Sequence, residues 1–95
     1  MSQKRHDEIL LNWQKDLEKD GYIALKNLCY PEHRYALGEI DILAFKDGYI
    51  YLFEIKSGNG SFRKGINQLR KAEDYLGAKC EKYLIMKDEE IYYLE

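Results

Sequence analysis

Apolar side chains recur with the period of an α-helix in two segments of the chain. The first predicted helix runs from about Gln3 to Lys19 and is ended by Asp20-Gly21; its apolar side consists of Ile9, Leu10, Trp13 and Leu17. The second predicted helix spans about Phe62 to Leu76, and Gly77 follows it in the position of a C-terminal cap. Each helix therefore has one apolar side, which we expect to pack against a sheet.

Short runs rich in apolar and β-branched residues predict strands elsewhere in the chain. The five predicted strands are about Tyr22–Leu28, Gly38–Lys46, Tyr49–Lys56, Lys82–Met86 and Ile91–Leu94. The segment from Tyr30 to Arg34 contains the only proline, so we expect a loop there. This order of elements (α, β, β, β, α, β, β) predicts one α+β or α/β domain over residues 1–95, with a mixed sheet flanked by helices.

A hairpin around Asp47-Gly48 is strongly indicated, because a type I′ turn needs positive φ at both central positions. With these residues as the loop, opposed residue numbers add to 95, so Asp41 faces Glu54 and Glu39 faces Lys56. Side chains alternate between the two faces of a sheet. One predicted face carries Glu39, Asp41, Leu43, Phe45, Ile50, Leu52, Glu54 and Lys56, and the other carries Ile40, Ile42, Ala44, Tyr51, Phe53 and Ile55.

Asp41 and Glu54 are thus predicted to be neighbouring carboxylates on a rigid sheet, where their mutual repulsion costs stability. A divalent cation such as Mg²⁺ or Mn²⁺ relieves this cost, since hard ions take carboxylate and water ligands. Lys56 lies on the same face, where it can orient a water or offset charge on a phosphate. The alternative is a salt-bridge cluster of these three residues that keeps a sheet edge soluble.

Asp41, a hairpin and then Glu54-Ile55-Lys56 resemble the signature of the PD-(D/E)xK nuclease superfamily, an acidic residue followed at hairpin distance by (D/E)-x-K. The superfamily core is a helix, a three-stranded meander with the motif, a second helix and further strands, which matches nearly the whole chain. The size and the GEIDI…FEIK pattern are most similar to archaeal Holliday junction resolvases and small stand-alone virus-type replication and repair nucleases. The resemblance implies a restriction-endonuclease-like core and a homodimer that cuts branched DNA with Mg²⁺ or Mn²⁺.

The resemblance also implies roles for individual residues. Asp41 and Glu54 would bind the metal together with the backbone carbonyl of Ile55, and Lys56 would be the catalytic lysine. Gln68 matches a glutamine that is often found on the helix after the motif. The alternative is that Gln68 is an ordinary residue on the flank of that helix.

Many members of the superfamily also carry a glutamate on the first helix near the metal. Glu8 is the obvious match, yet the helical period places it almost opposite the apolar side, whereas Asp7 lies at the edge of that side. Both alternatives stay open. Glu39 is a further charge without an assigned role, either pairing with Lys56 or adding a ligand.

The net charge of −2 is unevenly distributed along the chain. The segment from Ile55 to Ala72 contains no acid and five basic residues, namely Lys56, Arg63, Lys64, Arg70 and Lys71. Such a segment is typical of a protein that meets an anion on one face, and we expect Arg63, Lys64 and Lys71 to contact DNA. The alternative is a solvated helix face balanced by acids elsewhere.

The remaining reactive side chains point to no other chemistry. His6 and His33 lack a partner spacing for zinc or nucleophilic catalysis, so we expect ordinary surface roles. Cys29 and Cys80 have no metal-like spacing, and no signal peptide or membrane span is recognisable. We therefore expect an intracellular, cytoplasmic protein with reduced thiols and no membrane partner, compatible with a viral or plasmid-encoded origin, with a disulfide between these cysteines as the alternative.

The resemblance, together with these residues, implies a Mg²⁺-dependent endodeoxyribonuclease that is selective for branched DNA, as Holliday junction resolvases are. One alternative is a catalytically silent nucleic-acid-binding or assembly module of the same fold. Another is an exonuclease or single-strand nickase.

Overall fold

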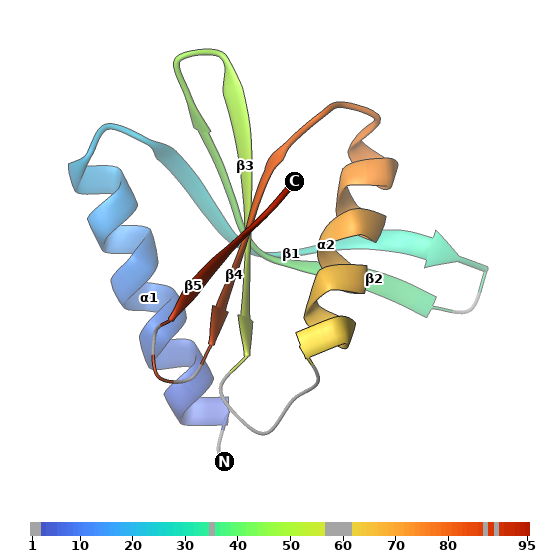
Figure 1. Cartoon of the computed structure of the whole chain (residues 1–95), viewed down its shortest axis with the longest axis horizontal. Coiled ribbons are helices and arrows are strands. Elements are labelled where there is room, and N and C mark those ends of the chain that lie inside the picture. The colour runs from blue at the N-terminus through green and yellow to red at the C-terminus, as the bar shows by residue number, and fades with distance from the viewer. Residues whose placement is uncertain (1–2, 35, 57–61, 87, 89) are drawn as a thin grey trace.

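The structure is a computed structural model that describes residues 3–34, 36–56, 62–86, 88 and 90–95 (Figure 1). Its elements are α1 (Gln3–Lys19), β1 (Ile23–His33), β2 (Ala36–Lys46), β3 (Tyr49–Lys56), α2 (Phe62–Leu76), β4 (Glu81–Met86) and β5 (Ile91–Leu94). The predicted bounds of α1, β3, α2 and β5 are confirmed. The predicted α+β class with a mixed sheet is confirmed as well.

The five strands form one sheet in the order β1-β2-β3-β4-β5. β3 and β4 are parallel and are connected through α2, whereas every other neighbouring pair is antiparallel. Figure 1 shows α1 and α2 on either side of the central strands. β3 is therefore the middle strand of the sheet and lies between the two helices.

Two hydrophobic clusters hold these layers together. The cluster under α1 consists of Ile9, Leu10, Leu17, Ala24, Ile42, Ala44, Phe53, Ile55 and Ile85. The cluster under α2 consists of Tyr30, Ile40, Leu43, Leu52, Leu69, Ala72, Cys80, Leu84 and Leu94. Cys29 is a free, exposed thiol and Cys80 a free, buried one, so the alternative disulfide between them is not formed.

The loop predicted from Tyr30 to Arg34 is wrong, because β1 continues through Pro31 to His33. Pro31 is paired with Leu37 of β2. A proline lacks a backbone N–H, and a strand tolerates this only where no further strand needs the donor. β1 is an edge strand, so Pro31 does not end it.

The long ribbon of β1 and β2 changes direction at Asn27, which has a left-handed φ of 54°. The ladder pairs Lys26 with Ile42 and Leu28 with Ile40, and it passes over the residues between them. Beyond this point Ile40 packs in the α2 cluster, whereas Ile42 packs in the α1 cluster. The prediction that both share one face is therefore wrong, because the twisted ribbon of β1 and β2 turns from one helix toward the other between these two residues.

Candidate active site

The turn between β2 and β3 fixes the register of these two strands. Asp47 and Gly48 have φ values of 53° and 84°, as a type I′ turn requires. The ladder extends from the turn to the pair Ile42–Phe53, and over this range the predicted register is confirmed.

The ladder ends at that pair, so the predicted direct pairings of Asp41 with Glu54 and of Glu39 with Lys56 are wrong. On the other edge of β2, Glu39 is opposed to Cys29 of β1. The bend of the β1–β2 ribbon at this level explains the difference, since β2 leaves β3 here. On the N-terminal side of Asp41, β2 continues in its ladder with β1 and has no ladder pairs with β3 among the described residues.

Where the ladder ends, the side chain of Asp41 takes the place of a backbone partner. Its Oδ2 accepts a hydrogen bond of 2.8 Å from the backbone N–H of Ile55. The N–H and C=O groups of one strand residue project to the same side, so the carbonyl of Ile55 is also directed toward β2. The Asp41 carboxylate and the Ile55 carbonyl therefore border the same gap between the strands.

The carboxylates of Asp41 and Glu54 are both withdrawn from water, with 3% and 5% of each residue exposed. The Lys56 ammonium lies 3.2 Å from Oε2 of Glu54. Burial raises the pKa of Glu54 to about 8; the charges of Asp41 and Glu39 add to this effect, and Lys56 opposes it. One lysine thus does not compensate for the negative charge at this site. The predicted alternative of a soluble sheet edge does not fit, because β3 is the central strand.

α2 covers this end of β3 closely. A Cβ atom at Gly65 would lie 2.7 Å from Cδ1 of Leu84 and 3.5 Å from Cε of Lys56, so the helix comes this near only with glycine there. Gln68 follows three positions later on the same side of the helix. Its Oε1 is buried and has no hydrogen-bond partner among the described residues. Buried amide oxygens are normally satisfied, so this one is available as a ligand or acceptor.

The prediction that His6 is an ordinary surface residue is wrong. Its Nε2 lies 3.3 Å from Oδ2 of Asp41, and only 16% of its side chain is exposed. The helical period contained a signal for this contact, because His6 precedes Ile9 by three positions and Leu10 by four. These spacings place the imidazole on the buried side of α1.

The acidic residues expected to reach the site from α1 are placed differently. Asp7 has 59% of its side chain exposed, and its Oδ1 lies 3.5 Å from Nδ1 of His6. Glu8 is an exposed residue of α1. The contact between α1 and Asp41 is therefore made by the imidazole of His6, and a catalytic role for Glu8 stays a prediction.

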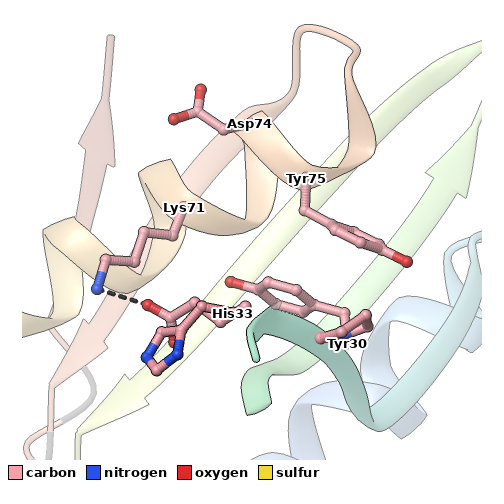
Figure 2. Close-up of a pocket in the computed structure, with 7 residues that line it drawn as sticks. Tyr30, His33, Lys71, Asp74 and Tyr75 are labelled. Carbon is pink, nitrogen blue, oxygen red and sulfur yellow. Dashed lines mark ion pairs between the residues drawn. The ribbon is translucent and has the colours of Figure 1, made fainter. Parts of the chain in front are cut away.

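The predicted DNA contacts are distributed along α2. Arg63 and Lys64 are exposed in its first turn. Lys71 lies two turns further on, and its ammonium forms an ion pair of 2.7 Å with Glu32 of β1 (Figure 2). These side chains do not gather around Glu54; they mark a path along the helix that leads away from it.

The donor set suits a hard divalent cation held by few protein ligands. Within the ranges that the structure describes, no three His, Cys, Asp or Glu side chains are grouped to hold a metal ion. Two buried carboxylates, a backbone carbonyl and an unsatisfied amide oxygen remain, and Mg²⁺ is commonly held by one or two carboxylates and several waters. The residues therefore fit such an ion, because it would offset the charge that raises the pKa of Glu54.

The order of elements and the acidic pair with its lysine define a nuclease fold of the PD-(D/E)xK type. The chain belongs to the nuclease-related domain family, whose model matches residues 2–91. Nuclease domains of this kind typically use divalent metals.

The fold is also found in the crystal structure of a protein of unknown function, AF1548, with a TM-score of 0.62 and 18% sequence identity. The similarity covers 81% of this chain but only 44% of that protein. No curated protein matches the chain. Among the described residues, no helix is long and apolar enough to cross a membrane.

Proposed function

We propose that the chain is a metal-dependent endonuclease that hydrolyses phosphodiester bonds of DNA, with Asp41, Glu54 and Lys56 as its catalytic group. The observation that carries the proposal is the buried carboxylate pair, in which the pKa of Glu54 is raised to about 8 despite a lysine at 3.2 Å. Such a pair costs stability in the absence of a cation, and strongly perturbed carboxylates cluster at functional sites. A purely structural role gives no reason to bury both charges.

Asp41, Glu54 and the carbonyl of Ile55 would hold the metal ion, and the unsatisfied Oε1 of Gln68 is a further acceptor for it or for a bound water. A bound Mg²⁺ or Mn²⁺ ion would lower the pKa of the attacking water and offset charge on the phosphate. His6 would orient this ligand set from outside it, since its Nε2 lies 3.3 Å from Oδ2 of Asp41.

Lys56 contributes a hydrogen-bond donor at the same place. Its stem passes beside Gly65, and its ammonium lies against Glu54, so it is held by both the helix and the strand. From this position Nζ would donate to the attacking water or to a phosphate oxygen, and its charge would stabilise the pentavalent transition state. Substituting it would therefore slow the reaction without removing the acidic ligands.

Branched DNA is the substrate that we propose, and a symmetric homodimer is the active form. Two sites related by a two-fold axis match the symmetry of a four-way junction. The β5 edge of the sheet exposes Ile91 and Tyr93 to 49% and 51%, which suits a contact between copies. Sedimentation equilibrium tests this point, and a monomer at concentrations that cut DNA would contradict it.

The competing function is a silent nucleic-acid-binding or assembly module of the same fold, and a third candidate is an exonuclease or single-strand nickase of that fold. The two classes differ in whether the acidic pair is needed. A module that only binds DNA gains nothing from Asp41 and Glu54, whose charge repels phosphate.

A cleavage assay on four-way junctions, flaps, linear duplex and single strands, with Mg²⁺, Mn²⁺ or EDTA, tests the proposal. We expect cutting only with metal, and Asp41→Asn and Glu54→Gln to reduce it by at least about 100-fold. Glu18→Gln, which changes an exposed carboxylate of α1, is the matched control. Cutting that survives EDTA or both substitutions would refute the mechanism. Binding without cutting of any substrate would favour the silent module.

A further inference from the structure

A pocket of about 450 Å³ lies between the end of β1 and the C-terminal half of α2 (Figure 2). It exists because β1 continues past Pro31 and bends at Asn27, so that its last residues lie against α2. Its size is within the range of small-molecule and nucleotide sites. None of its lining residues belongs to the acidic pair or its lysine.

One wall of the pocket is aromatic. Tyr75 of α2 stacks on Tyr30 of β1 with ring centroids 4.6 Å apart. The ring of Tyr30 is fixed over Gly38, where a Cβ atom would lie 2.1 Å from a ring carbon. Tyr30 is 6% exposed, whereas Tyr75 is 53% exposed. Tyr75 therefore has a rigid support on one side and an open surface on which a planar ring can stack.

The other wall is charged. Lys71 and Glu32 form their ion pair there, His33 lies beside it, and Asp74 of α2 also lines the pocket (Figure 2). The Lys71 side chain remains 59% exposed, so an incoming anion can reach it. Residues 62–71, the first part of α2, carry no acid and four basic residues, namely Arg63, Lys64, Arg70 and Lys71. A phosphate backbone that follows these charges is guided to the pocket.

The pocket is connected to the candidate active site through α2 and Tyr30. Gly65 contacts the stem of Lys56, and Lys71 and Tyr75 lie about 9 and 15 Å further along the helix axis. This span corresponds to roughly three to four stacked nucleotides at 3.4 Å each. Burial raises the pKa of Tyr30, and the charges of Glu32 and Glu54 raise it further. The phenol of Tyr30 is therefore near enough to interact electrostatically with Glu32 in the pocket and with Glu54 in the candidate active site.

We propose that this pocket holds one unpaired nucleotide of the DNA substrate, with its base stacked on Tyr75 and its phosphate or base carbonyl bound by Lys71. This inference rests on the proposed nuclease function and deepens it. A base inside a duplex is paired and stacked on its neighbours, so it enters only after it is unpaired and unstacked, at an energetic cost that an unpaired base avoids. The pocket therefore selects DNA with a single-stranded segment a few nucleotides from the cleaved bond, as in a flap or a frayed branch.

Fluorescence anisotropy in EDTA tests the proposal with labelled flap DNA and a fully paired duplex of the same length. Tyr75→Ala is expected to raise the Kd for the flap by about 5- to 150-fold, which corresponds to about 1 to 3 kcal/mol for one stacked base. Its Kd for the duplex should not change. Tyr75→Phe keeps the ring and should bind as the unsubstituted chain does. Tyr49→Ala, which removes a 62% exposed tyrosine at the hairpin, is the matched control.

Two variants test the charged wall and leave the aromatic stack in place. Lys71→Gln should weaken flap binding and reduce the slope of log Kd against log salt by about 1. Glu32→Gln should tighten flap binding, because it releases the ammonium of Lys71 from its ion pair. Thermal unfolding monitored by circular dichroism checks that each variant is folded. If Tyr75→Ala proves unfolded, the two charge variants decide the question.

The proposal is overturned if Tyr75→Ala or Lys71→Gln changes flap binding no more than Tyr49→Ala does. It is also overturned if the losses are equal for flap and duplex. Because binding is measured without metal, these outcomes are independent of cleavage. A chain that prefers flaps through Tyr75 but never cuts would refute the proposed endonuclease and retain the pocket. A chain that cuts DNA but binds flaps equally well without Tyr75 would retain the proposed endonuclease and refute the pocket.

Discussion

Replacing Glu54 with glutamine should stabilise the metal-free protein at pH 8. The carboxyl of Glu54 has a pKa of about 8 in the folded chain and an ordinary value of 4.5 when unfolded. Between these two values the folded state retains a proton that the unfolded state has lost, so the free energy of unfolding falls as the pH rises. A shift of this size corresponds to about 3 to 5 kcal/mol lost between pH 4.5 and pH 8. Glutamine resembles the protonated carboxyl and should abolish this loss.

Urea unfolding in EDTA at a series of pH values from 5 to 8.5 measures this difference. We expect Glu54→Gln and the unsubstituted chain to be equally stable near pH 5 and to diverge as the pH rises. Glu18→Gln, the exposed control, should follow the unsubstituted chain throughout. Adding Mg²⁺ or Mn²⁺ at pH 8 should restore stability to the unsubstituted chain but not to Glu54→Gln. Parallel pH curves for the two proteins would refute the reasoning that burial of an uncompensated carboxylate destabilises the chain.

Three further substitutions test how the site is supported. His6→Ala should weaken Mn²⁺ binding, followed by electron paramagnetic resonance, by about 10- to 100-fold, whereas His33→Ala should not. Gly65→Ala should destabilise the chain by about 1 to 3 kcal/mol in thermal unfolding, since its Cβ would clash with a buried side chain, whereas the exposed Asn67→Ala should not. Asn27→Val should cost about 1 to 3 kcal/mol because of the positive φ there, and Asn27→Gly should cost little. Equal effects of the two Asn27 variants would show that the bend does not depend on the left-handed residue.

Much of the framework follows from neighbours along the chain. The helical period determines α1 and α2, and Asp47-Gly48 determines the turn and the register near it. Such signals are local, because they depend on residues within one or two turns or on the two positions of a hairpin loop. For the same reason the sequence alone brought Asp41, Glu54 and Lys56 to one end of one hairpin.

The failures share a physical reason as well. The loop predicted at Pro31 assumed that proline ends a strand, but whether its missing donor matters depends on the strand's place in the sheet. The alternation assumed for Ile40 and the pairing assumed for Asp41 depended on a straight ribbon, and the bend at Asn27 removed that condition. Edge position and bending are set by packing against other elements, which no window of sequence contains.

The sequence by itself therefore determined the elements, their order and the residues that carry the candidate chemistry. The tertiary structure decided how those residues are used. It buried both carboxylates, brought His6 to Asp41 across 35 positions of the chain, and folded the end of β1 against Tyr75 to form a pocket. Periodicity and turns are encoded by adjacent residues, whereas burial, electrostatic coupling and pockets arise only when distant elements pack together.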